Sequence, residues 1–148
     1  MWKFLVLLHA LAGIVLLGAS THHAIIAIGT VRGVFRFRLS KLYALIVVVA
    51  YSVTFGLGAL AYPRFRHLVR AVYLDEYAAC ASRLFEAKED LASLALPLVL
   101  SSLVMAYGLH SKTEKTTVFG YAFAVTAVAL VVWFNVICGL LITMTKAA

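Results

Sequence analysis

The first apolar run of the chain, residues 2–29, constrains the fold more than any other part of the sequence. Lys3 is its only residue with a permanent charge, although three of the protein's five histidines lie within the run. A helix needs ~20 apolar residues to cross the ~30 Å hydrocarbon core of a bilayer. The run is therefore long enough to span a membrane.

Composition extends this conclusion to the whole chain. Of the 148 residues, 64% are hydrophobic and only 13% are charged, and the mean hydropathy is +1.01. A water-soluble domain with this composition has too few polar side chains to cover its surface. We therefore predict an all-α integral membrane protein, because the apolar runs are continuous and lack the alternation of barrel strands.

The first run also has some features of a secretory signal peptide. Lys3, the apolar segment after it and the small residues 18–20 match the three parts of such a signal. The apolar run continues past this supposed cleavage site to Gly29. This continuation favours a retained membrane span.

Three further apolar runs complete a four-helix pattern. We predict spanning helices at residues 4–29, 42–62, 91–110 and 117–143, forming one transmembrane domain over residues 1–148. Pro63 marks a kink or boundary after the second span, and residues 63–90 have the helical apolar spacing of an additional amphipathic segment at an interface. Four spans place both termini on one side of the membrane, called side B here, and the loops at 31–41 and 111–116 on side A.

The charges and cysteines exclude some functions without identifying one. The net charge is +7 and the isoelectric point is near 9.7, but basic residues in a membrane protein flank the spans, so no nucleic-acid function is predicted. Side A has six basic residues and side B has seven, which predicts no orientation. Cys80 and Cys138 have no metal-binding or disulfide-type spacing.

Histidines on the first predicted span are its unusual feature. His9 and His23 are 14 residues apart, which on an ideal helix places them on one face, separated by ~21 Å along the axis. His22 lies ~140° around the helix from His9, so it is the weaker partner. Small residues between the two levels on the shared face leave room for a flat ligand or a second helix.

Depth sorts the other histidines into two possible pairs. His9 and His67 lie toward side B, whereas His23 and His110 lie toward side A. Two imidazoles facing each other across a helical bundle can ligate a b-type haem on both axial sides. Arg64 and Arg66 near His67, like the arginines that follow His23, offer cations to haem propionates; the full predicted set is His9, His23, His67, His110, Arg64 and Arg66, with His22 as an alternate metal ligand.

The spacing of His9 and His23 resembles that of the membrane cytochromes b, which stack two haems across a bilayer. The sequence Leu8-His9-Ala10 with Gly18 also resembles the first helix of several small haem- or copper-related membrane families. The resemblance covers about 25 residues and implies two b haems with bis-histidine ligation. In the cytochromes b a second helix carries its own spaced pair, whereas here the second pair is split between His67 and His110.

Three functions remain open from the sequence. The chain is a membrane electron-transfer protein or haem b subunit of a quinone-linked respiratory complex, a non-catalytic accessory subunit of a larger membrane complex, or a copper or other metal-binding protein using His22 and His23. No nucleotide loop, hydrolase triad or facing pair of carboxylates is recognisable. An electron carrier or subunit is therefore favoured over a stand-alone enzyme, and we expect other membrane subunits or a redox partner, possibly a quinone.

Overall fold

The protein is an antiparallel bundle of long helices. The computed structural model describes residues 2–110 and 113–147, with side chains described up to residue 144, and all regular structure in these residues is helical. Four helices are long and apolar enough to cross a membrane. In chain order the elements are α1 (Trp2–Val31), α2 (Phe37–Phe65), the π-helix η1 (Arg66–Leu74), the single turn α3 (Asp75–Tyr77), α4 (Ala79–Gly108) and α5 (Lys115–Ala147).

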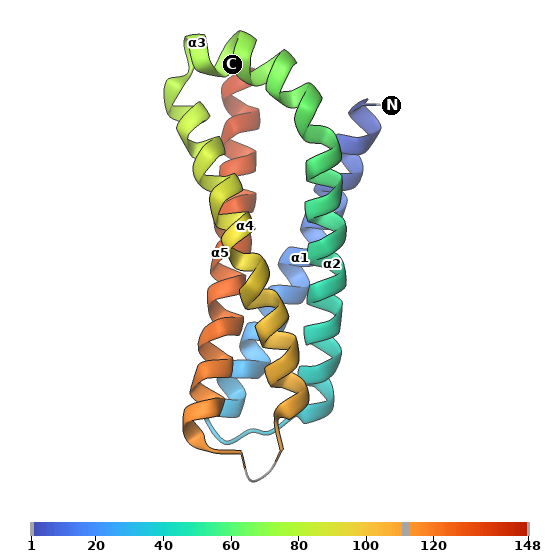
Figure 1. Cartoon of the computed structure of the whole chain (residues 1–148), viewed down its shortest axis with the longest axis vertical. Coiled ribbons are helices and arrows are strands. Elements are labelled where there is room, and N and C mark those ends of the chain that lie inside the picture. Colours follow the sequence, from blue (N-terminus) through green and yellow to red (C-terminus); the bar gives the residue numbers. More distant parts are fainter. Residues whose placement is uncertain (1, 111–112, 148) are drawn as a thin grey trace.

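The long helices form a ring in which each contacts two neighbours. Contacts join α1 to α2, α2 to α4, α4 to α5 and α5 to α1, whereas α1 faces α4, and α2 faces α5, across the bundle within the described residues. Both chain termini lie at the end that carries η1 and α3, here called the terminal end (Figure 1). The loops between α1 and α2 and between α4 and α5 lie at the opposite loop end. Gly33 adopts a φ of 86° in the first of these loops, a conformation that glycine accepts without strain.

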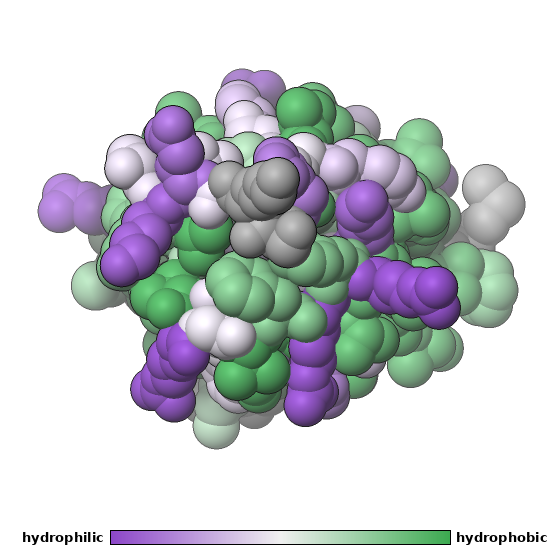
Figure 2. All heavy atoms as spheres, turned by 90° about the horizontal axis from the view of Figure 1, so that it is seen from below, coloured by the Kyte–Doolittle hydropathy of each residue, from purple (hydrophilic) through white to green (hydrophobic). Residues whose placement is uncertain are grey.

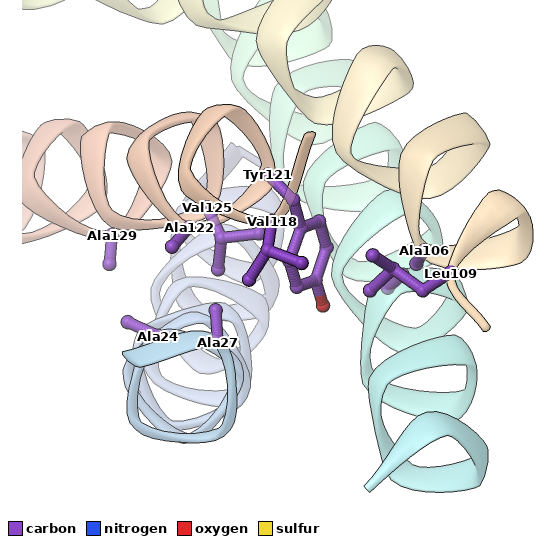
Figure 3. Close-up of a cluster of buried hydrophobic side chains, with 10 residues drawn as sticks. Ala24, Ala27, Ala106, Leu109, Val118, Tyr121, Ala122, Val125 and Ala129 are labelled. Carbon is purple, nitrogen blue, oxygen red and sulfur yellow. The ribbon is translucent and has the colours of Figure 1, made fainter. Parts of the chain in front are cut away.

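Small residues allow close packing near the loop end. Ala27, Ala44 and Ala106 are fully buried, and methyl side chains let helix backbones approach one another closely. Figure 3 shows alanines of α1 and α4 around Tyr121 and the valines of α5. The buried members of this cluster are Ala24, Ala27, Ala44, Ala106, Leu109, Val118, Tyr121, Ala122, Val125 and Ala129.

Two further apolar clusters follow along the bundle axis. The middle cluster contains Tyr51, whose hydroxyl donates a 2.5 Å hydrogen bond to the carbonyl of Ala92 and so joins α2 to α4. The cluster at the terminal end includes Phe85, whose ring lies 4.5 Å from that of Phe65 between centroids. Each cluster contains residues of several helices, so apolar packing holds the bundle together along most of its length.

Ionic contacts hold the turn at the terminal end against α4. Arg70 of η1 forms salt bridges with Glu86 of α4 and, at 3.6 Å, with Asp75 of α3. Ser82 donates a hydrogen bond to the carboxylate of Asp75. These contacts tie the connection between α2 and α4 to the start of α4.

The outer faces of the helices are apolar, whereas the loop end is basic. Ile14, Leu60, Val104 and Phe123 are exposed large apolar side chains, one from each long helix, as expected for helices surrounded by lipid. Figure 2 views the loop end, where hydrophilic side chains project around the edge. Arg32, Arg36 and Arg38 are exposed there.

The helices extend beyond the predicted apolar spans. α4 begins at Ala79, 12 residues before the predicted start at residue 91, and ends at Gly108, so His110 lies outside the helix. Hydropathy marks the part of a helix that contacts lipid, whereas the helix itself continues through charged residues that favour helical structure. α2 likewise continues through Pro63, and wider π-helical winding begins at Arg66.

The loop-end packing predicts that Ala106→Leu destabilises the bundle. A leucine at this fully buried position overfills the contact between helices, which costs ~1–3 kcal/mol. Thermal unfolding in detergent, followed by circular dichroism, measures the effect. The control is Ala59→Leu, at an exposed position of α2; equal melting temperatures for the two variants would contradict the observed packing.

Candidate functional site

His9 is held between α1 and α2 in one orientation. Its Nδ1 lies 2.9 Å from the carbonyl oxygen of Thr54, and because a carbonyl can only accept, Nδ1 carries the proton and donates. In a neutral imidazole the other nitrogen, Nε2, is then an unprotonated acceptor. Nε2 forms no hydrogen bond with the described residues. A ring nitrogen in this state is the form that binds a metal.

Gly58 provides the space for the His9 ring. A Cβ added at this position would lie 3.1 Å from His9 Cε1, which is closer than most real contacts. Glycine at position 58 therefore lets the imidazole lie directly against the backbone of α2. The half-buried ring is fixed by its hydrogen bond and by this close contact.

Lys88 of α4 lies at the same level of the bundle. Its Nζ is 4.0 Å from the position that a Cβ on Gly139 of α5 would occupy and 5.7 Å from the ring centroid of Phe85. Cys138, which precedes Gly139 on α5, is buried. We call this group the His9 site: His9, Thr54, Gly58, Lys88, Cys138 and Gly139.

The His9 site lies between two apolar clusters. The middle cluster ends at Leu16 of α1 and Val132 of α5, and the cluster at the terminal end resumes at Phe85 and Ile142. Toward the terminal end the α1–α2 pair diverges from the α4–α5 pair (Figure 1). Polar side chains therefore occupy the level at which the two helix pairs separate.

His23 belongs to a second polar group, near the loop end. Its Nε2 lies 2.8 Å from the hydroxyl oxygen of Tyr121, and both side chains are almost completely buried. Ser40 of α2 lies beside the Tyr121 hydroxyl, but its buried Oγ has no hydrogen-bond partner among the described residues. The pair joins α1 to α5 and occupies Nε2 of His23.

The other predicted site residues lie on the outside. His22 is exposed and stacks on Tyr43, with ring centroids 5.1 Å apart. His110 is exposed beyond α4, with Nδ1 3.0 Å from the Gly108 carbonyl. The structure also exposes His67, Arg64 and Arg66, which lie where α2 passes into η1.

This arrangement does not fit two bis-histidine haems. The predicted partners His67 and His110 are exposed, and His23 is already bonded to Tyr121. Within the described residues no group of three or more histidine, cysteine or acidic side chains could hold a metal ion. Of the candidate ligands, His9 alone has a bonded Nδ1, a free Nε2 and a half-buried position in the described part of the chain.

The sequence analysis did not identify Lys88 or Tyr121 as site residues. Lys88 is one of the seven basic residues on side B and lies among the charges of residues 83–90, so the sequence pattern does not distinguish it from them. Only its position on α4, which lies diagonally opposite α1 in the bundle, sets it apart. Tyr121 is separated from His23 by 98 residues, so only the packing of α1 against α5 brings them together.

Comparisons with known proteins add no family assignment. The chain matches no family model, no curated protein and no solved structure.

Gly58→Ala is expected to displace the His9 ring. The added Cβ meets Cε1 at 3.1 Å, so the imidazole must move and its hydrogen bond to Thr54 must lengthen. Nuclear magnetic resonance of ¹⁵N-histidine-labelled protein in detergent reports this change at His9. Gly56→Ala is the matched control, because a Cβ there meets no heavy atom within 4 Å; unchanged His9 signals in Gly58→Ala would refute the proposed contact.

Tyr121→Phe is expected to lower the stability of the bundle. Removing the hydroxyl leaves a buried His23 nitrogen without its partner, which costs ~1–3 kcal/mol. Tyr107→Phe, at an exposed position of α4, is expected to leave the stability nearly unchanged. A thermal-unfolding cycle with His23→Leu tests the pairing: strictly additive effects of the two substitutions would show that the residues do not interact.

Proposed function

We propose that the protein is a small membrane-embedded electron-transfer protein that binds one b-type haem through His9. The orientation of His9 carries this proposal. Metal-ligating histidines almost always donate their second ring N–H to a carboxylate, carbonyl or water, which fixes the tautomer and strengthens the ligand. The hydrogen bond from His9 to the Thr54 carbonyl has this form.

Haem supplies one-electron chemistry when bound, and the protein controls its environment. His9 would hold the haem iron through Nε2, because the hydrogen bond from Nδ1 to the Thr54 carbonyl leaves Nε2 unprotonated. The apolar outer faces of α1 and α2 support a location of this site within a bilayer. Electron exchange then requires a partner in or at the membrane, either another subunit or a quinone.

The proposal has one haem level instead of the two expected from the histidine spacing. His23 is a structural residue in it, because its bond to Tyr121 holds α1 against α5. The same bond argues against a copper site that uses His22 and His23, because these residues lie ~100° apart around α1, with His22 exposed and His23 buried. In this proposal the haem lies toward side B, the side on which both termini are expected.

A non-catalytic accessory subunit is the second candidate. An open apolar groove between α1 and α2 supports it, because this kind of surface accepts a lipid chain or a partner helix. The groove is lined by Ala12, Val15, Leu45, Ile46, Val49, Ala50 and Val53. In this role His9 serves only to hold α1 against α2.

Visible spectra distinguish the two candidates. Protein purified after expression with added haem is expected to show the oxidised and reduced bands of one b haem per chain. His9→Leu is expected to lose these bands, whereas His67→Leu and His110→Leu, at exposed positions, keep them. If the wild-type protein contains no haem, or if His9→Leu retains the full amount of haem, the haem proposal is wrong and the accessory-subunit role remains.

A further inference from the structure

We propose that the loop end of the bundle binds one anionic phospholipid, with its phosphate at Lys41 and its two acyl chains on either side of Leu45. Both residues lie on α2, about one helical turn apart. Open apolar grooves flank this part of α2 on two sides, and basic side chains lie where the grooves reach the loop end. The His9 site contributes no residue to this lipid site.

The first groove lies between α2 and α4. Its volume is about 400 Å³, and it is lined by Leu45 of α2 and by Leu103, Val104 and Tyr107 of α4. This volume falls within the range of ~300–1,000 Å³ that is usual for ligand sites. Apart from the Tyr107 hydroxyl, the lining side chains are apolar, so the groove suits an acyl chain.

The second groove lies on the other side of α2, against Ala12 and Val15 of α1, and has a volume of about 440 Å³. Leu45 lines this groove as well as the first, so it separates the two. The second groove extends to Val53, 12 residues beyond Lys41. That distance is ~18 Å along the helix, about half of the ~30 Å hydrocarbon core, which is the depth that one acyl chain reaches.

Lys41 lies at the mouth of the first groove. Its Nζ is 5.5 Å from the ring centroid of Tyr107, a residue that lines this groove. Arg38, Lys41 and Leu45 lie within ~60° of one another around α2. Two cations therefore follow one another above Leu45 on the same face of the helix, at the level of the head groups.

The cations of the loop end have no anionic partner in the described part of the chain. The salt bridges found there all involve Arg70, at the terminal end, and Lys41 forms no hydrogen bond with the described residues. Basic side chains between the spanning helices of a bundle bind the head groups of anionic lipids. The described charged residues of the loop end are Arg32, Arg36, Arg38, Lys41 and Lys115, with Glu114 as their only acid.

Charge and shape together select the occupant. A free phosphate would bind the cations but would leave both grooves empty. A partner helix is ~10 Å wide, so it fills the groove on one side of α2 and not the other. A zwitterionic lipid brings a second cation to a surface that already has an excess of them, whereas an anionic lipid with two chains uses the cations and both grooves.

Native mass spectrometry of the full chain in detergent tests this proposal. The protein is titrated with dioleoyl phosphatidylglycerol and with dioleoyl phosphatidylcholine, which have the same acyl chains. Wild-type protein is expected to bind one phosphatidylglycerol with a preference of ~5-fold or more, the fold change for one basic residue at an anionic lipid surface. Lys41→Met is expected to lose most of this preference, whereas Lys41→Arg keeps it.

A second variant tests the groove independently of the charge. Val104 is 72% exposed, so Val104→Trp fills the first groove without disturbing the core, and it is expected to weaken the binding of both lipids. The matched controls are Lys115→Met and Phe119→Trp, at exposed positions of α5, which are expected to keep the wild-type affinities. Circular dichroism and gel filtration establish that each variant retains its helices and its size.

Several results would overturn the proposal. Equal affinities of the wild-type protein for the two lipids, or an equal loss of preference in Lys41→Met and Lys115→Met, would show that no local site selects the head group. Unchanged lipid affinities in Val104→Trp would exclude the first groove, and displacement of the lipid by millimolar inorganic phosphate would show that the cations bind phosphate alone. A lipid-free dimer that Val104→Trp dissociates would identify a second copy of the chain as the occupant. These measurements need no haem, so they succeed or fail independently of the proposed function.

Discussion

The cost of leaving a polar group without a partner in apolar surroundings governs this structure. The helices satisfy their own backbone groups, and several serine and threonine hydroxyls donate to a carbonyl of their own helix, as those of Thr21, Thr54 and Ser102 do. Other polar side chains form hydrogen bonds between helices. Tyr51, His9 and His23 each join two helices through a single hydrogen bond, so these bonds fix relative positions that nonspecific apolar packing leaves adjustable.

The sequence predicted the helices well and their ends poorly. Long apolar runs indicate spanning helices because hydrocarbon excludes other backbone conformations, and all four candidates are present. An apolar run cannot show where a helix ends when the helix continues into charged residues, and α4 begins 12 residues before its apolar run. The hydropathy pattern likewise gives no indication of the change from α-helical to π-helical winding after Pro63, although a proline indicates that the helix is locally disturbed.

The candidate site was predicted only in part, because helical periodicity fixes a face and says nothing about the opposite helix. His9 and His23 were placed on one face, and in the structure His23 is buried and His9 half-buried. Their partners, the Thr54 carbonyl and Tyr121, depend on how α1 packs on α2 and α5. Lys88 resembles any other charged residue until the diagonal relation of α1 and α4 is known.

The connection between the two helix pairs has a mechanical consequence for the His9 site. Along the chain, η1 and α3 link α2 to α4 at the end where the pairs diverge. A π-helix winds more residues into each turn than an α-helix does, so η1 is shorter than the same nine residues would be in α form. Because η1 and α3 connect the pairs at this end, the separation of the pairs beside the His9 site depends on the winding of a segment that contributes no residue to the site.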